Sequence, residues 1–414
     1  MSEKRTRVFY YLQQPHRLGQ LIQEVFFLRN LFDDADYDFV VITPPPDDRV
    51  NKACYDFIMQ GVRVVQKQPG EFQWSTTEGV KHIDGDIYFF RGAFDEQFDF
   101  LRKFQHKKPS FFYSLSNGDI DRIKRMRAMF GIPQDAPVVT LHNREEGYLR
   151  EADTHEIHAF RNADINNYVP AIEYLLSKGY YVVRIGDKTM QPLPELSERV
   201  IDAPFHKLYS SFVELCFIAT CRFYLGIPSG PQSLQMSLPV PGLIVNSLIK
   251  SESWGNEGDI YLMKKYYSHV LKRYLSYSEV VTSPLPDFQE AQMYRDSGVE
   301  LHENSAQEIL EATREMDARL NGEYSPDQFI AKRIKQIEHR GDCYRKHACH
   351  RHPFLSIYGS GIQIGHEFIK MNPWFIEDKN WEPAEGVTSK QMMVDEGYVA
   401  GFSGAWHGDS LTVG

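Results

Sequence analysis

Polar residues suited to binding a phosphate follow an apolar run at residues 138–141. The sequence there reads Leu141-His142-Asn143-Arg144-Glu145-Glu146-Gly147-Tyr148. In an extended chain His142 and Arg144 lie on one face, because side chains alternate along a strand. The planar guanidinium of Arg144 can hold a phosphate through two parallel hydrogen bonds, which a lysine cannot do. The alternative is a surface loop in which Arg144 pairs with a neighbouring glutamate.

A second candidate segment reads Gly226-Ile227-Pro228-Ser229-Gly230-Pro231-Gln232-Ser233-Leu234. Ser229 or Gly230 is suited to the position before a first helical turn, and Pro231 to that turn itself. Backbone N–H groups at a helix start attract anions, and glycine allows a phosphate to approach the chain closely. The segment from Ser229 to Gln232 therefore predicts an anion-binding turn. The alternative is an ordinary capped helix.

Two further loops carry charge where a ligand would pass. The first, Gln14-Pro15-His16-Arg17-Leu18-Gly19-Gln20-Leu21, joins the first predicted strand to the first predicted helix. It adds His16, Arg17 and Gly19 as candidates, or is simply a helix-entry loop with exposed charge. The second, Val183-Arg184-Ile185-Gly186-Asp187, ends another predicted strand. There Arg184 either adds positive charge to a site or pairs with Asp187.

Two patterns look like metal sites, but neither has the spacing or setting of one. Cys343, His347, Cys349, His350 and His352 lie close together in the sequence, but an adjacent Cys-His pair fits no standard zinc spacing. Asp84-Gly85-Asp86 contains a turn-prone Asp-Gly pair and leads into an apolar run, so it predicts a turn. The motifs of P-loop NTPases, zinc proteases and serine hydrolases do not occur in the sequence. We therefore expect no metal site.

The elements that position these residues alternate between short apolar runs and amphipathic segments, which predicts an α/β fold with parallel sheets covered by helices. The ends of such strands form the crevice in which α/β proteins bind ligands. Strands are predicted at Val8–Leu12, Asp38–Thr43, Val62–Val65, Ile87–Phe90, Ser110–Tyr113, Val138–His142, Tyr181–Ile185, Arg222–Gly226 and Leu243–Asn246. Helices are predicted at Leu21–Phe32, Lys52–Met59, Asp119–Phe130, Ile165–Lys178, Pro231–Leu238, Ala306–Leu320, Pro326–Arg340 and Gly361–Met371.

The turn-rich segment Gly131–Pro137 separates two such series of elements. A chain of 414 residues, of which 42% are hydrophobic, is long enough for two domains. We therefore expect two Rossmann-like domains that face each other across a cleft, with the boundary at this segment.

Composition excludes several classes of protein. Forty-six basic against 56 acidic residues give a net charge of −10, whereas a general nucleic-acid binder carries a basic surplus. Five irregularly spaced cysteines favour reduced thiols over a disulfide framework. No apolar run reaches the roughly 18–20 residues of a membrane span, and Val8–Leu12 is too short for a signal peptide core. We expect a cytoplasmic protein that does not bind nucleic acid and has no membrane span.

Taken together, these segments resemble a bacterial family of GT-B glycosyltransferases, distantly similar to protein O-fucosyltransferases, α-1,6-fucosyltransferases and heptosyltransferases. The resemblance covers most of the chain, from about residue 8 to residue 373. The matching segments are Pro15–Leu21, Gly131–Pro133, Val139–Tyr148, Arg161–Tyr168, Gly179–Asp187, Pro228–Pro231 and Glu367–Pro373.

The resemblance implies a GT-B-like fold with three parts. Residues 1–133 would form an acceptor-side domain, residues 134–340 a nucleotide-sugar-binding domain, and residues 341–414 an extension that packs back on the first domain. The implied activity is that of a metal-independent hexosyl- or deoxyhexosyltransferase of glycan biosynthesis. Its donor would be a GDP- or UDP-linked sugar, with no other cofactor, and its acceptor a glycan, a lipid-linked group or a small molecule.

The resemblance also implies roles for single residues. Arg144 would contact the diphosphate, and Ser229, Gly230, Pro231 and Gln232 would surround its oxygens, with Arg17, Gly19, Arg184 and Asp187 as further donor-binding candidates. The family more often has histidine where this chain has Gln20, and an amide does not titrate near pH 7. The base therefore stays open among His16, Glu145, Glu146 and Asp187, and His142 is a further catalytic candidate. A sugar-nucleotide epimerase and a non-catalytic sugar-nucleotide or glycan-binding protein are the alternatives.

Overall fold

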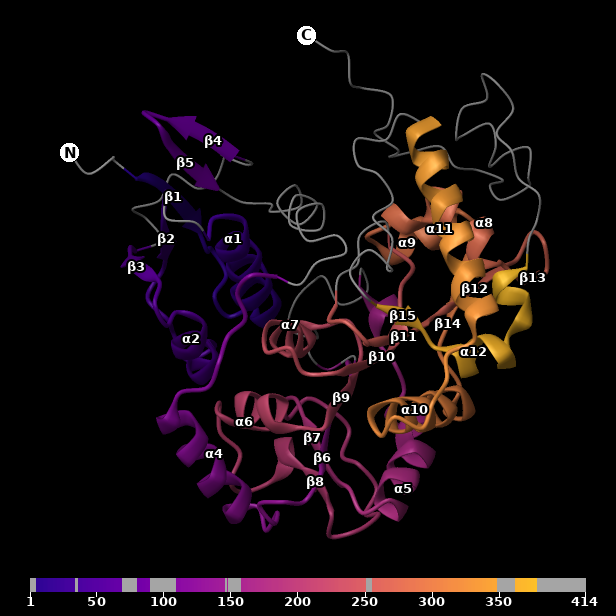
Figure 1. The fold of residues 1–414 in the computed structure, drawn as a ribbon, viewed down its shortest axis with the longest axis horizontal. Helices are drawn as coiled ribbons and strands as arrows, with labels where there is room; N and C mark the ends of the chain where they lie inside the picture. Colours follow the sequence, from indigo (N-terminus) through magenta and orange to yellow (C-terminus); the bar gives the residue numbers. More distant parts are fainter. Residues whose placement is uncertain are drawn as a thin grey trace. The chain divides into compact units, whose positions relative to one another are not determined.

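The structure is a computed structural model that describes residues 5–33, 36–68, 80–89, 109–145, 147, 158–250, 255–347 and 362–377. Figure 1 labels the helices and strands of the chain. The chain divides into two compact units. The first contains residues 1–142, 176–188 and 194–242, and the second contains residues 143–175, 189–193 and 243–414.

The first sheet has five strands in the order β3-β2-β1-β5-β4. The strands are β1 (Thr6–Tyr11), β2 (Tyr37–Thr43), β3 (Arg63–Gln66), β4 (Val80–Ile83) and β5 (Asp86–Phe89). All neighbours are parallel except β4 and β5, which form a hairpin. At its turn Asp84 and Gly85 have φ angles of 51° and 83°, which suit a tight hairpin turn. The turn predicted here is confirmed, and the Asp86 carboxylate accepts hydrogen bonds from Arg7.

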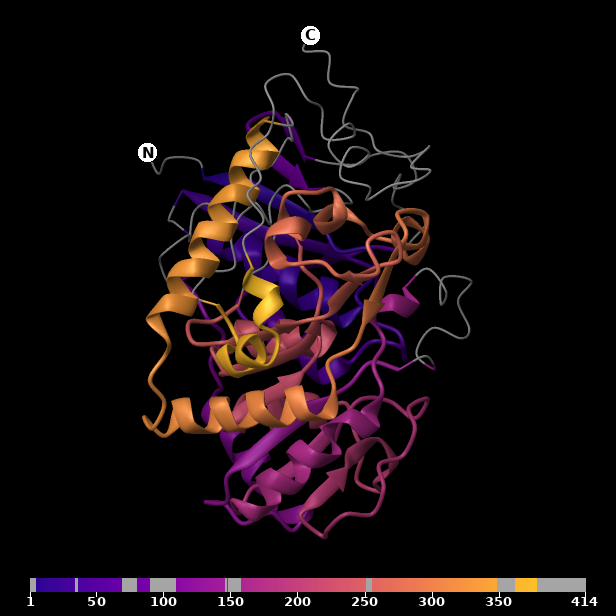
Figure 2. The same cartoon turned by 90° about the vertical axis from the view of Figure 1, so that its right-hand side faces the viewer.

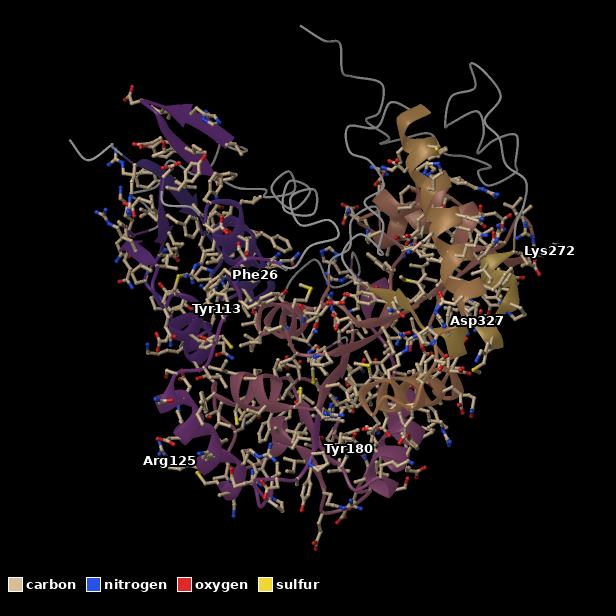
Figure 3. The ribbon with its side chains drawn as sticks, in the orientation of Figure 1. Phe26, Tyr113, Arg125, Tyr180, Lys272 and Asp327 are labelled. Carbon is tan, nitrogen blue, oxygen red and sulfur yellow. The ribbon has the colours of Figure 1, made fainter. Side chains whose placement is uncertain are left out.

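The segment Ser110–Tyr113 is not a strand, contrary to the sequence-based prediction. The Phe111 N–H donates to the Asn30 side chain at 3.0 Å, and the Tyr113 N–H donates to the Ser237 carbonyl at 3.0 Å. Isolated partners therefore satisfy this backbone instead of a neighbouring strand. The aromatic side chains fill the core beside the first sheet, where the Phe26 and Tyr113 rings lie 6.4 Å apart (Figure 3).

The second sheet has seven strands in the order β15-β11-β10-β9-β6-β7-β8. The strands are β6 (Val138–His142), β7 (Tyr181–Ile185), β8 (Val200–Asp202), β9 (Phe223–Gly226), β10 (Gly242–Ser247), β11 (Ile260–Met263) and β15 (Gln363–Ile364). The strands pair in parallel at β6–β7, β6–β9, β7–β8, β10–β11 and β11–β15. Numbered along the chain, the first six strands follow the order 3-2-1-4-5-6, which is that of dinucleotide-binding sheets. The predicted α/β fold with two Rossmann-like sheets is confirmed.

The helices largely follow the predicted segments. In the first unit they are the π-helix η1 (Gln20–Glu24), α1 (Val25–Leu31), α2 (Lys52–Ile58), α4 (Asn117–Met129), α6 (Val213–Thr220) and α7 (Gly230–Ser237). The others are α5 (Val169–Ser177), α8 (Tyr277–Val281), α9 (Ala291–Asp296), α10 (Ala306–Leu320), α11 (Gln328–His347) and α12 (His366–Met371). A small antiparallel sheet contains β12 (Lys265–Ser268), β13 (Arg273–Tyr274) and β14 (Val299–His302). Across the described residues, no helix combines the length and apolarity of a membrane span.

The domain limits expected at residues 133 and 340 can be compared with the elements that lie there. Helix α11, seen along its length in Figure 2, continues through residue 340, where one limit was expected. The limit at residue 133 falls in the loop between α4 and β6. Strand β15 pairs with β11, and α12 contacts α10. Most of residues 341–414 lie outside the described residues, so their packing on the first domain stays a prediction.

Candidate functional site

The strand order of the second sheet reverses beside β6. The chain passes from β6 to β7 on one side and later returns to β9 on the other, and ligands bind where the order reverses in this way. Leu141 lies opposite Leu225 of β9, and His142 opposite Ile185 of β7. The carboxyl ends of these three strands therefore lie side by side. They bring together His142, the Gly186–Asp187 loop and the loop that leads to Ser229.

His142 and Ser229 contact each other at this edge. The Ser229 Oγ lies 3.1 Å from His142 Nδ1, and its hydroxyl donates to the Ile227 carbonyl at 3.1 Å. When the hydroxyl proton is donated to Ile227, the Ser229 oxygen can accept a hydrogen bond from a protonated Nδ1 of His142. Ser229 precedes α7 as predicted, but its side chain makes no capping hydrogen bond with the helix. The first turn of α7 thus has no side-chain cap at a position suited to an anion.

The start of α7 packs tightly against the loop that follows β1. A Cβ atom at Gly230 would lie 2.9 Å from the Leu18 Cβ and 3.1 Å from the Gly19 nitrogen. In the next turn the Ser233 hydroxyl donates to the Gln23 Oε1 at 3.4 Å. Residue 230 must therefore be glycine for the two loops to approach. The structure brings Gly19 and Gly230 together, and both were candidates.

Arg184 is buried and pairs with a residue of a neighbouring strand, and its role in donor binding stays a prediction. Its side chain is 0% exposed, and its Nη1 lies 3.3 Å from an Asp202 oxygen. The two residues are on the paired strands β7 and β8. Asp202, which the sequence analysis did not name, is a partner of Arg184. Arg184 is therefore enclosed in the protein.

Asp187 lies near a buried acidic group that the sequence did not reveal. Glu214 of α6 accepts hydrogen bonds from Tyr209 at 3.1 Å and from Asn51 at 3.1 Å. Burial raises the pKa of Glu214 to about 7, against the opposing effect of these hydrogen bonds. Asp187 acts electrostatically on both Glu214 and Tyr209. Glu214 stands in the apolar run Val213–Ile218, and nothing in that run predicts a role for it.

The loop after β1 places its two charged candidates differently. His16 is half-buried, and burial lowers its pKa, as do Arg49 and Arg17 to a smaller extent. The imidazole is therefore neutral at pH 7 and able to accept a proton. Arg17 is exposed.

Arg144 and Glu145 belong to the second unit. The Arg144 side chain is buried, and its carbonyl accepts from the Ala163 N–H at 3.0 Å. The Glu145 carboxylate accepts from the Gln191 N–H at 2.7 Å. Glu146, another candidate base, lies outside the described residues.

Glu145 borders a pocket of about 400 Å³, within the range of small-molecule sites. Acids, amides and small residues line it, and none of the described lining residues is a lysine or arginine. Such a lining accepts hydrogen bonds from hydroxyl groups and does not suit a diphosphate. The lining residues are Glu145, Gly147, Ala159, Asn162, Ala163, Asp164, Ile165, Asn166, Thr189, Gln191 and Glu303.

The cysteine- and histidine-rich segment is only partly described. Cys343 is exposed on α11, and its Sγ lies 3.7 Å from the His339 Nε2. Cys349, His350 and His352 lie outside the described residues. Within the described ranges, no three His, Cys, Asp or Glu side chains are grouped to hold a metal ion.

Comparison with known proteins gives structural overlaps only. No family model matches the chain, and no curated protein matches it. A family 9 glycosyl transferase from Veillonella parvula DSM 2008 overlaps at a TM-score of 0.37 and 11% identity, over 64% of this chain and 87% of its own. The E. coli ADP-heptose LPS heptosyltransferase II overlaps at a TM-score of 0.33 and 13% identity, over 60% of this chain and 86% of its own. S. aureus MnaA, solved with UDP, overlaps at a TM-score of 0.32 and 11% identity, over 80% of this chain and 95% of its own.

The first two of these proteins are glycosyltransferases, the class that the sequence resemblance indicated. At TM-scores below 0.5, the overlaps carry no argument about this chain. The Rossmann-like character of the two sheets follows from their own strand order and parallel pairing.

Proposed function

We propose that this protein is a metal-independent glycosyltransferase. It would move a hexosyl or deoxyhexosyl group from a GDP- or UDP-linked donor to a hydroxyl group of a glycan, a lipid-linked molecule or a small molecule. The observation that carries the proposal is the contact of His142 with Ser229 where the strand order reverses, beside the uncapped start of α7. An edge of this kind suits the phosphates of a nucleotide.

The chemistry of the leaving group explains why such an edge would serve transfer. When the bond between the sugar C1 and the phosphate oxygen breaks, negative charge develops on the diphosphate. Backbone N–H groups near Ser229 and the guanidinium of Arg144 are the groups that we propose to stabilise it, an effect that is typically worth several kcal/mol.

The first test is a thermal-shift screen against GDP, UDP, ADP and CMP. A nucleotide at 100 times its Kd should stabilise the fold by about 2.7 kcal/mol, which raises Tm measurably. Release of that nucleotide from its sugar-linked form is then followed with and without EDTA. We expect equal rates in both.

Each other result has a definite meaning. A strict requirement for Mn²⁺ or Mg²⁺ would contradict metal independence. An altered sugar still attached to its nucleotide would indicate the epimerase alternative. Binding without turnover would indicate the non-catalytic alternative, and no binding of any nucleotide would refute the proposal.

A further inference from the structure

A hydrogen-bonded carboxyl group lies where the strand order of the first sheet reverses. That reversal is between β1 and β5, where Tyr10 pairs with Phe89 near the carboxyl end of β1. The Tyr10 hydroxyl donates to the Glu24 carboxylate, and the Gln20 side chain forms a second hydrogen bond with it. Ligands bind at such ends in α/β sheets, so Glu24 lies at a second edge suited to a substrate.

The local backbone explains why Gln20 and Glu24 meet. They are the first and last residues of η1, and a wide π-helical turn is rare and frequent at functional sites. The turn starts directly after Gly19, which approaches the start of α7, and Gln23 next to Glu24 bonds Ser233 of α7. The carboxyl group is therefore held in the segment that adjoins the proposed phosphate-binding turn.

The surroundings of Glu24 favour its neutral form. Burial raises its pKa to about 7, and the hydrogen bonds of Tyr10 and Gln20 act in the opposite direction. Among the described residues no charged group contributes to this shift. Helices α1, α2 and α7 pack on η1, and Tyr10 of β1 also contacts Glu24; α7 has no titratable side chain. Those of α1 and α2 have other surroundings: Arg29 lies over the Phe111 ring, Lys52 pairs with Asp56, Cys54 lies near Glu214, and burial raises the pKa of Tyr55.

An acceptor atom at the same place has no partner. The Gln20 Oε1 is buried and makes no hydrogen bond with any described residue. Burying such an atom unpaired is costly, and a hydroxyl group of a bound molecule would satisfy it. Glu24 as a whole residue is half-buried, so part of it reaches the protein surface.

We propose that Glu24 is the general base of the transfer reaction, with Gln20 Oε1 helping to orient the acceptor; this rests on the proposed function. The Glu24 carboxylate takes the proton of the acceptor hydroxyl as its oxygen bonds to the sugar C1. The bond from C1 to the phosphate oxygen breaks at the same time, and its electron pair leaves with the nucleoside diphosphate. The glutamic acid then releases its proton to solvent. Glu24 would thus accept the proton that Gln20, which cannot titrate, cannot accept.

The test compares Glu24→Gln and Glu24→Asp with Glu214→Gln. The last is a matched control, because Glu214 is another buried glutamate whose pKa is raised to about 7. The activity is release of nucleoside diphosphate from GDP-mannose, GDP-fucose, UDP-glucose and UDP-N-acetylglucosamine with water as acceptor, from about pH 5.5 to 8.5. The Kd for GDP and UDP and the Tm are measured on the same samples.

In the wild type we expect the rate to rise with pH through an apparent pKa near 7 and then level off. Glu24→Gln should lower it by on the order of 100-fold and remove the pH dependence, while Kd stays unchanged. Glu24→Asp should retain more activity than Glu24→Gln, and Glu214→Gln should keep the rise of the rate with pH. Tm should not fall in Glu24→Gln, because a neutral amide avoids the buried charge.

Failure of the inference and failure of the proposed function give different results. If the wild type is active and Glu24→Gln keeps its rate and pH profile, the inference is overturned and the proposed function stands. If Glu214→Gln loses the same activity together with the rise of the rate with pH, loss of a buried carboxyl group and not proton transfer is the cause, and the inference is again overturned. If the wild type releases nothing from any donor, the proposed function fails and the role of Glu24 fails with it.

Discussion

The reversal points of the two sheets share a topology but carry different chemistry. In the second sheet, His142 and Ser229 meet beside a glycine and a helix start, an arrangement that suits negative charge. In the first sheet, Tyr10 and Gln20 surround a carboxyl group with a pKa of about 7, an arrangement that suits proton transfer. Strand order thus determines where a ligand binds, whereas the loop side chains determine what is done to it. Under the proposal, one edge holds the donor and the other deprotonates the acceptor.

Substitution of Arg144 should have the largest effect on the donor side of this comparison. Arg144→Lys keeps the charge but loses the planar fork, and Arg144→Ala loses both. We expect nucleotide affinity to fall in the order wild type, Lys, Ala, by about 1.5–3 kcal/mol for full loss, measured by calorimetric titration. The pH dependence of the residual rate should not change. Unaltered affinity in Arg144→Ala with an intact fold would remove Arg144 from the site.

Gly230 and Gly19 provide a matched pair of alanine substitutions. A Cβ at Gly230 would lie 2.9 Å from Leu18, whereas a Cβ at Gly19 would lie at an ordinary 3.7 Å from the Gly230 Cα. Gly230→Ala should therefore cost about 1–3 kcal/mol in the free energy of unfolding and weaken nucleotide binding. Gly19→Ala should cost much less. Denaturant unfolding checks both, and equal costs would contradict the close approach of the loops.

The pH dependence of stability tests the acceptor side. Because the folded protein holds the Glu24 proton more tightly than the unfolded chain, the free energy of unfolding should fall as pH rises from about 4.5 to about 7 and then level off. Glu24→Gln should remove about 1–2 kcal/mol of this fall, less than the full pKa shift implies, since Glu24 as a residue is only half-buried. Glu214→Gln should remove a comparable part. A profile unchanged by Glu24→Gln would show that Glu24 titrates normally.

Ser229→Ala should give the smallest change. It removes the hydroxyl that contacts His142 and leaves the backbone of the turn in place. We expect nucleotide affinity to fall by about 0.5–1.5 kcal/mol, the usual value of one hydrogen bond. His142→Asn, titrated in parallel, shows whether the histidine contributes beyond that bond. A loss as large as that of Arg144→Ala would mean that the hydroxyl itself binds the ligand.

Local signals predicted the parts of the fold that local forces determine. Helix α10 has the predicted bounds Ala306–Leu320, because Ser305 and Glu308 form a capping box ahead of a regular apolar period. The position of Ser229 at the start of α7 could also be predicted, since serine before Gly-Pro suits that position. Parallel strands followed from short apolar runs between helical segments.

Contacts between distant residues account for what the sequence did not reveal. Ser110–Tyr113 has the composition of a strand, but Asn30 and Ser237 bind its backbone. The pairing of Arg184 with Asp202 was not predicted, because Asp202 belongs to another strand. Glu24 looked like the polar face of an amphipathic helix, since its contact with Tyr10 exists only once β1 and η1 pack together. Burial and pairing of this kind are not encoded in spacing.

The contact of Gly230 with Leu18 and Gly19 also constrains how this protein can be altered. Any side chain introduced at position 230 meets the loop after β1, so the two loops cannot be varied independently. A library intended to change donor preference should therefore randomise positions 18, 19 and 230 together. Among related sequences, a residue larger than glycine at position 230 should occur with a compensating change at position 18.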